Sequence, residues 1–166
     1  MEKTIYLAGP LFETAHRHRN ILLAYALKAL GYRMILPQDE ALKFFDGKSF
    51  DLIGICEGCL KDATTSDVVV ANLDGPDTDS GTAFEVGAAI LSARLNRKLG
   101  RNKPLVICVR TDFRTASDKE VGINAMFRLS DKIIEKPAYV NSLEEVEKFY
   151  KELAQEIHEY ILSRLG

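Results

Sequence analysis

The chain has 166 residues, which is enough for one domain with a sizeable core, and we expect residues 1–166 to form that single domain. Hydrophobic residues make up 46% of the chain, charged residues make up 28%, and the net charge is −2. This composition excludes a strong attraction to nucleic acid or anionic membranes, and no apolar run is long enough to span a bilayer. The opening MEKTIYLAGP lacks the longer apolar core of a signal peptide, so we expect a cytoplasmic protein.

In the first half of the chain, short apolar runs alternate with longer stretches of helical periodicity. The sequence predicts a strand at 4–9 that stops at Gly-Pro, a helix at 15–30 and a second strand at 32–37. Residues 39–48 indicate a loop with a short helix. The next helix is expected to begin at Ser49, acting as its cap, and to run to about Thr65.

The second half opens with the clearest buried strand, DVVVANL at 67–73, which is a nearly continuous β-branched run. A helix at 80–96 and a fourth strand at 104–110 follow. The segment 111–131 is polar and irregular, and it is too long for a simple connector, so it suggests a functional loop.

The chain ends with a fifth short strand within 132–140 and a helix from Ser142, where SLEE is a capping box. This order of elements indicates an α/β fold: a three-layer sandwich with a largely parallel five-stranded sheet, Rossmann- or flavodoxin-like. Ligands of such sheets bind beyond the carboxyl ends of the strands. We therefore expect one rim to carry the loops that follow Ala8, Leu36, Leu73 and Arg110.

The three cysteines do not suggest a secreted disulfide framework, because their number is odd. Cys56 and Cys59 form a C-x-x-C, for which a redox pair or half of a zinc site is one interpretation. No second C-x-x-C and no H-x-x-x-H completes a zinc site, so we expect buried or half-buried helix thiols and no metal.

The stretch DTDSGTAFEVGAA, after the 67–73 strand, carries two carboxylates on the expected rim. Asp79 lies at the end of the loop, Gly81 permits a close approach to the backbone, and Glu85 lies one turn into the helix. The apolar neighbours of Glu85 predict a helix that is buried nearly all round, and the helix dipole predicts a lowered Glu85 pKa. Two carboxylates at one small cavity are typical of glycosyl transfer.

Simpler interpretations of the same residues stay open. Asp79 alone would be a helix N-cap, and Glu85 alone a solvated helix residue. The SGT turn is also compatible with a phosphate loop, although the chain has neither G-x-G-x-x-G nor G-K-[ST] there.

Three blocks of the sequence resemble the nucleoside 2-deoxyribosyltransferases. They are TIYLAGPLF, DVVVANLDG with the D-x-G-x-x-x-E-x-G pattern of DSGTAFEVGAA, and INAM. The blocks follow the order of that family and span residues 4–126, about three-quarters of the chain. The resemblance implies transfer of 2-deoxyribose between nucleobases by a retaining double displacement, with deoxyribonucleosides and free bases as substrates and no cofactor.

The resemblance also implies a role for each matching residue. Glu85 would be the nucleophile, Asp79 would protonate the departing base and deprotonate the incoming one, and Tyr6 would hydrogen-bond Glu85 and orient it. The base pocket would be walled by Gly9, Pro10 and Phe12, with Gln38 or Asp39 at the base edge. Asn124 and Met126 would enter the site of a neighbouring subunit, which implies a homo-oligomer with shared active sites.

One position departs from the family pattern. Relatives carry an acid eight residues ahead of the Asp that begins the central strand, and counting back from Asp67 this chain has Cys59 there. Asp62, nearly one helical turn later, is either an alternative source of that carboxylate or a solvated surface charge.

Two rival functions fit the same architecture. The first is a 2-deoxynucleoside 5′-phosphate N-hydrolase, which passes the sugar to water. Such an enzyme binds a phosphate, and His16, Arg17 and Arg19 are candidate ligands for it. The second is a non-catalytic nucleotide- or flavin-binding module, which gives no reason for Tyr6 and Glu85 to meet.

Overall fold

The computed structural model describes residues 2–101, 104–112 and 123–166. Its centre is a five-stranded sheet in the order β2-β1-β3-β4-β5, and every neighbouring pair is parallel. The strands are β1 (Thr4–Ala8), β2 (Arg33–Ile35), β3 (Val68–Asn72), β4 (Leu105–Arg110) and β5 (Lys132–Glu135). This flavodoxin-like order confirms the predicted α/β sandwich, with the switch in strand order between β1 and β3.

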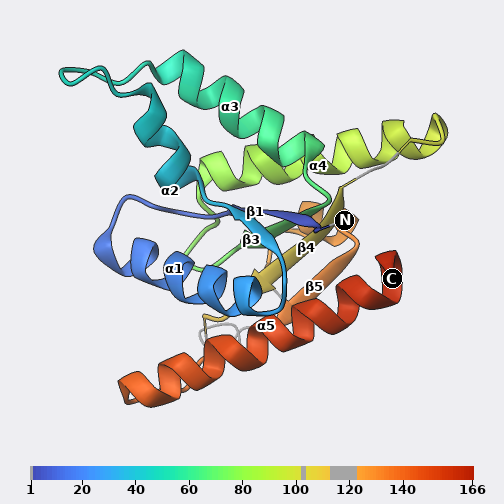
Figure 1. Cartoon of the computed structure of the whole chain (residues 1–166). Coiled ribbons are helices and arrows are strands. Elements are labelled where there is room, and N and C mark those ends of the chain that lie inside the picture. Colours follow the sequence, from blue (N-terminus) through green and yellow to red (C-terminus); the bar gives the residue numbers. More distant parts are fainter. Residues whose placement is uncertain (1, 102–103, 113–122) are drawn as a thin grey trace.

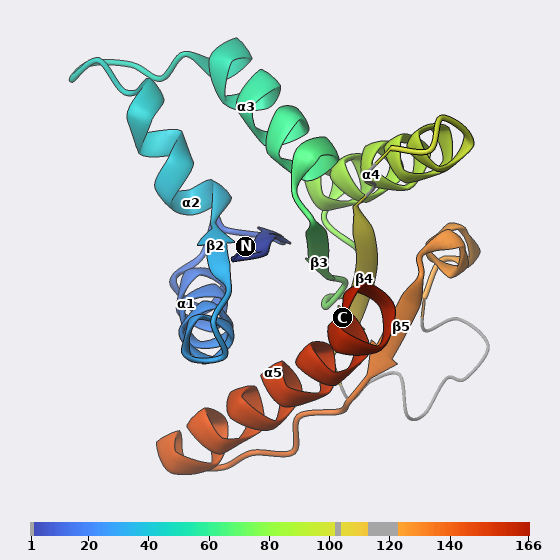
Figure 2. The same cartoon turned by 45° about the vertical axis from the view of Figure 1, so that its right-hand side comes forward.

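Helices cover both faces of the sheet (Figures 1 and 2). Helix α1 packs beside α5 on one face, and α3 packs beside α4 on the other. The helices are α1 (Thr14–Ala29), α2 (Pro37–Glu40), α3 (Leu52–Thr65), α4 (Ser80–Lys98) and α5 (Leu143–Leu165), with 3-10 turns η1 (Ala41–Phe44) and η3 (Ala125–Leu129). None of the described helices is both long and apolar enough to cross a membrane.

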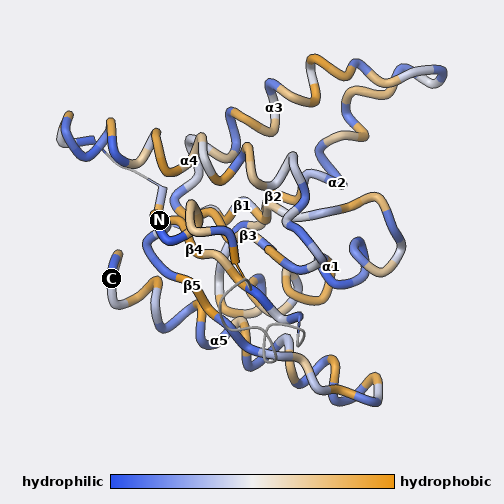
Figure 3. Tube along the Cα trace, turned by 180° about the vertical axis from the view of Figure 1, so that it is seen from behind, coloured by the Kyte–Doolittle hydropathy of each residue, from blue (hydrophilic) through white to orange (hydrophobic). Residues whose placement is uncertain are grey.

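The strand period of two sends alternate side chains into two separate cores. Ile5 and Leu7 of β1 join the core beneath α1 and α5, while Tyr6 and Ala8 join the core beneath α3 and α4. Figure 3 shows the resulting concentration of apolar residues along the central strands. Tyr6 is therefore directed toward α4 by its place in the strand.

The start of α3 differs from the prediction. Asp51, not Ser49, caps this helix, and its side chain accepts a hydrogen bond from the Gly54 nitrogen at 3.0 Å. Ser49 instead belongs to a turn, because its backbone nitrogen donates to the side chain of Asp46 at 2.8 Å. This turn precedes α3 at the end of the segment that projects away from the sheet in Figure 1.

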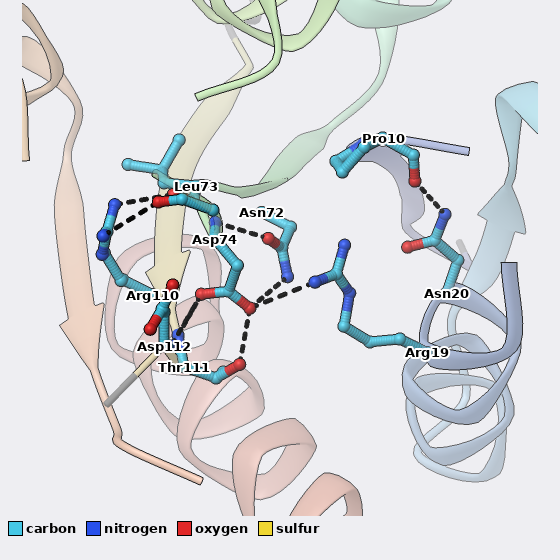
Figure 4. A network of polar contacts seen from close by, with 10 residues as sticks. Pro10, Arg19, Asn20, Asn72, Leu73, Asp74, Arg110, Thr111 and Asp112 are labelled. Carbon is cyan, nitrogen blue, oxygen red and sulfur yellow. Dashed lines mark hydrogen bonds and ion pairs between the residues drawn. The ribbon is translucent and has the colours of Figure 1, made fainter. Parts of the chain in front are cut away.

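The carboxyl ends of β3 and β4 are joined by one half-buried carboxylate, Asp74, which follows β3 (Figure 4). Its Oδ2 accepts from Arg19 Nη1 of α1 at 3.2 Å and from Asn72 Nδ2 at 3.1 Å. The same oxygen accepts from Thr111 Oγ1 at 2.6 Å, and Oδ1 accepts from the Asp112 nitrogen at 2.9 Å. Asp74 thus joins α1 to the ends of β3 and β4.

A buried arginine adds a second tie at this edge. Arg110, the last residue of β4, donates to the carbonyl oxygens of Leu73 at 2.9 Å and Gly75 at 3.1 Å. These bonds fix the start of the loop that leads to Asp79 and α4. These contacts join the loops after β3 and β4, and the parallel pairing of β1 with β2 and β3 places the loops after Ala8 and Leu36 at the same edge, as expected.

We predict that Asp74→Asn lowers the free energy of unfolding by about 3 kcal/mol, because it leaves the largely buried Arg19 without its counter-charge. Urea unfolding followed by circular dichroism measures the difference.

The matched control is Asp77→Asn in the same loop. Asp77 is exposed, and among the described residues its side chain bonds only to the neighbouring Thr78 nitrogen, so its replacement should change stability by no more than about 0.5 kcal/mol. Equal losses in the two variants would contradict the role given to Asp74.

Candidate functional site

The centre of the site is a hydrogen bond between two residues that are 79 positions apart in the chain. Tyr6 Oη donates to Glu85 Oε1 at 2.8 Å, as the family resemblance implied. The register of β1 buries the ring of Tyr6, and the position of Glu85 on α4 brings its carboxylate to the phenol. A buried hydroxyl needs a partner, and this contact supplies it.

The pKa of Glu85 contradicts the expectation from the helix dipole. Burial raises the pKa of Glu85 to about 7, the hydrogen bond from Tyr6 lowers it, and the charge of Asp79 raises it. Glu85 lies beyond the first turn of α4, where the dipole has largely faded, so desolvation dominates. Burial and then the charge of Glu85 raise the pKa of Tyr6, which remains a protonated donor.

Asp79 is the N-cap of α4. Its Oδ2 accepts from the Thr82 nitrogen at 2.9 Å and from Thr82 Oγ1 at 3.0 Å. Gly81 lies against the same oxygen, since a Cβ at this position would be 3.3 Å from it. No donor among the described residues contacts Oδ1, so the cap uses only one of the two carboxylate oxygens.

Three of the predicted pocket residues meet at the ends of β1 and β2, around a residue that the sequence did not single out. Asn20 of α1 is buried, and its Nδ2 donates to the Pro10 carbonyl at 3.1 Å and to Gln38 Oε1 at 3.2 Å. Gly9 lies close by, with a hypothetical Cβ 3.7 Å from Asn20 Oδ1. An Asn within an otherwise amphipathic helix gave only a weak signal, because the contact joins distant segments.

Two other predicted pocket residues lie outside this group. The Phe12 side chain is 82% exposed, so within one chain it walls no enclosed cavity. Asp39 follows Gln38 on α2 but is exposed. Of the two candidates for the base edge, only Gln38 is directed into the protein.

Asn124 and Met126 lie at a different cavity. A hollow of about 590 Å³ separates α4 from η3, and the lining residues include Val86, Ile90, Leu91, Asn124 and Met126. Glu85 is not one of them. Asn124 caps η3 by accepting from the Met126 nitrogen at 3.0 Å, and Met126 is 68% exposed. Residues 113–122 of the predicted functional loop lie outside the described residues.

The prediction that α4 is buried nearly all round is wrong. Its buried face carries Thr82, Val86, Ala89 and Ala93. A second apolar stripe, Phe84, Leu91 and Leu95, is exposed, and Phe84 is 70% accessible. A sequence window cannot distinguish burial within one chain from an apolar face that a single chain leaves open.

Cys59, the residue at the position of the family's acid, lies beside Tyr6. Cys59 packs against the core that contains Tyr6, and burial raises the pKa of the Cys59 thiol. Cys56 is exposed, so the expectation of packed thiols holds for Cys59 but not for Cys56. Among the described residues, no group of three or more His, Cys, Asp or Glu side chains is placed to hold a metal ion.

The profile of the nucleoside 2-deoxyribosyltransferase family matches residues 5–126. The match covers more than half of the chain and includes the Tyr6–Glu85 pair, the Asp79 cap and Asn124. The chain belongs to the nucleoside 2-deoxyribosyltransferase family, whose enzymes act on nucleosides. A search of curated protein sequences finds no significant match.

Several solved structures share the fold. A conserved protein from Enterococcus faecalis is 25% identical, with a TM-score of 0.62 over 92% of this chain and 99% of its own. A 2-deoxyribosyltransferase from Bacillus psychrosaccharolyticus is 24% identical, with a TM-score of 0.56 over 87% and 90%. A CMP N-glycosidase from Clostridium botulinum is 15% identical, with a TM-score of 0.58 over 95% and 99%.

We predict that the Glu85 carboxyl carbon, followed by NMR, titrates near pH 7, and that Tyr6→Phe moves this titration to higher pH. The hydrogen bond from Tyr6 favours the ionised carboxylate, so its loss must raise the pKa of Glu85. The folded-state pKa exceeds the unfolded value of 4.5, so the stability contributed by Glu85 protonation is complete below pH 4.5 and is lost as pH rises to about 7.

Tyr25→Phe is the control, because Tyr25 is an exposed tyrosine on α1. It should leave the titration of Glu85 unchanged. A Glu85 carboxyl that titrates near pH 4.5 would show that burial does not govern its charge.

Proposed function

We propose that this protein transfers 2-deoxyribose from one nucleobase to another through a glycosyl-enzyme ester on Glu85. The observation that carries the proposal is the half-buried carboxylate of Glu85, which accepts a hydrogen bond from Tyr6 Oη at 2.8 Å. A pKa near 7 gives Glu85 a substantial ionised fraction at neutral pH, as a nucleophile requires.

In the first step, a Glu85 oxygen attacks the anomeric carbon while the bond from that carbon to the base nitrogen breaks. The electron pair leaves with the base, which takes a proton from Asp79. Positive charge builds on the sugar in the transition state, and the absence of a 2′-hydroxyl makes this charge easier to form.

In the second step, a nitrogen of another base attacks the same carbon, and Glu85 leaves as a carboxylate. The attacking nitrogen of the incoming base gives its own proton to Asp79. Asp79 is thereby protonated again, so atoms and charges balance over the cycle. Two inversions give net retention at the anomeric carbon.

The capping bonds of Asp79 are compatible with this proton transfer. Oδ2 holds the Thr82 nitrogen and hydroxyl, which fixes the carboxyl plane. Oδ1 has no donor among the described residues and supplies the position for the proton. Asp79 therefore serves both as the cap of α4 and as the proposed general acid.

We further propose that a second copy of the chain completes the site. Asn124 lines the cavity between α4 and η3, which Glu85 does not line. Leu91 of the exposed stripe Phe84, Leu91 and Leu95 lines the same cavity. An interface along this stripe buries apolar surface and carries Asn124 to the site of the partner. Exclusion of water there favours a bound base over hydrolysis.

The 5′-phosphate hydrolase is less well supported by the contacts of the first helix. Arg19, one of its three proposed phosphate ligands, is paired with Asp74. The products decide between the two activities, because a hydrolase releases the sugar whether or not an acceptor base is present.

We predict that incubation with deoxyinosine and adenine yields deoxyadenosine and hypoxanthine, measured by chromatography, with little reaction when adenine is omitted. Glu85→Ala should lower transfer by several orders of magnitude, since the covalent route is lost. Glu57→Ala, which alters an exposed glutamate on α3, should retain full activity.

A 2-fluoro sugar analogue that slows the second step should leave an adduct on Glu85, located by mass spectrometry of peptides. Free sugar formed at the same rate without adenine would reject the transferase in favour of a hydrolase. An adduct on another residue would reject Glu85 as the nucleophile.

We predict that Glu85→Ala and Asn124→Ala, each inactive alone, regain activity when mixed under conditions that let subunits exchange. Some hybrid sites then combine an intact Glu85 with an intact Asn124 of the other subunit. Subunit exchange is verified separately by native mass spectrometry of differently labelled chains. Proven exchange without recovered activity would place Asn124 in its own subunit's site.

A further inference from the structure

Cys56 and Cys59 lie three residues apart within α3, so their side chains project from successive turns on the same side of the helix. The two thiols differ in exposure. Cys56 is exposed, whereas Cys59 is half-buried and packs against the core that contains Tyr6. Burial raises the pKa of the Cys59 thiol, and the charges of Glu85 and Cys56 raise it further. The pair thus extends from the protein surface to the core around the proposed nucleophile.

The helix between the two thiols is locally weak. A disulfide holds its Cβ atoms about 3.5–4.5 Å apart, whereas helix residues three positions apart hold theirs about 5–6 Å apart, so closure requires a small distortion of α3. Gly58 lies between the cysteines, and glycine is a poorer helix former than alanine because its backbone loses more freedom.

Packing does not explain the glycine at this position. A Cβ at Gly58 would lie 3.4 Å from the Phe44 ring, which is an ordinary contact distance. At Gly54, by contrast, a Cβ would lie 2.7 Å from the same ring, so only Gly54 is required for space. Gly58 instead lowers the cost of distorting the segment that joins Cys56 to Cys59.

We propose that Cys56 and Cys59 form a modification site for low-molecular-weight disulfides, such as glutathione disulfide, and that closure of this pair inactivates the Tyr6–Glu85 site. The loss of activity rests on the proposed base exchange, whereas the modification itself does not.

The modification consists of two thiol–disulfide exchanges. In the first, the Cys56 sulfur loses its proton and attacks one sulfur of the reagent. The S–S bond of the reagent breaks, one thiol is released with that proton, and a mixed disulfide remains on Cys56. In the second, the Cys59 sulfur loses its proton and attacks the Cys56 sulfur, which releases the second thiol. The two protein thiols are thereby oxidised by two electrons, and the reagent is reduced to two thiols.

Closure reaches the proposed site through Cys59. The disulfide draws the Cys59 sulfur toward Cys56 and away from the core around Tyr6, whose side chain is fully buried. The lost contacts loosen the phenol that donates to Glu85 Oε1 at 2.8 Å. A disulfide closed against the helix geometry is readily reduced, so the inactivation is reversible.

The test treats the protein with glutathione disulfide and follows free thiols, peptide masses and base exchange. Wild type should form the Cys56–Cys59 disulfide and lose about tenfold or more of its transfer rate, because a misplacement of about 1 Å can slow a reaction about a hundredfold. Dithiothreitol should restore both the thiols and the rate. Cys108 is the internal reference, because it is fully buried and should stay reduced.

Three variants separate the steps. Cys56→Ser should be insensitive to the reagent. Cys59→Ser should stop at a mixed disulfide on Cys56 and keep the activity that it had before treatment. Gly58→Ala should keep the activity of the reduced wild type and should slow closure about fivefold, because the stiffer helix resists distortion.

A mixed disulfide that persists on Cys56 of the wild type would overturn the proposal, as would an equal loss of activity in wild type and Cys59→Ser. The NMR resonance of the Glu85 carboxyl needs no turnover, and it should move on oxidation of the wild type but not of Cys59→Ser. That movement without base exchange in the reduced protein rejects the transferase alone. Base exchange that survives complete disulfide formation rejects this inference alone.

Discussion

The central strands of the parallel sheet, β3 and β4, are buried on both faces, and this constraint organises the rest of the molecule. Helices cover both sides of the five strands, so polar chemistry is confined to the carboxyl edge or must be satisfied within the cores. The Asp74 and Arg110 bonds satisfy that edge and hold its loops together. Tyr6 places a polar hydroxyl inside one of the cores, and this hydroxyl donates to Glu85.

The Tyr6–Glu85 bond links folding to the proposed chemistry. Burial of the carboxylate costs stability as it ionises, and the same burial raises its pKa to about 7. A fully solvated glutamate would be ionised without this cost, but water would surround it as well. Near neutral pH, Glu85 is therefore present in both its protonated and its ionised form, and the hydrogen bond from Tyr6 favours the ionised form.

The two apolar surfaces of α4 have different uses. One surface packs on the sheet and positions Glu85 against Tyr6, while the other, with Phe84, Leu91 and Leu95, is exposed. Leu91 also lines the cavity that Asn124 borders. The proposed shared site follows from this division, because one helix then belongs to the core of its own chain and to the interface. On the other face of the sheet, Asn20 of α1 donates a hydrogen bond to Gln38 Oε1.

The sequence alone determined the order of the strands and helices, the parallel sheet and the rim where its loops meet, because hydrophobic periodicity and turn residues act over short stretches. The sequence alone also determined the spacing of Asp79 and Glu85 and the resemblance of that pattern to the family. Only the tertiary structure decided that the pKa of Glu85 is raised, that Asp51 rather than Ser49 caps α3, that Phe84 is exposed and that Asn20 orients Gln38. Burial and hydrogen bonds between distant segments depend on the three-dimensional packing of the elements, and local periodicity carries no record of which segments meet.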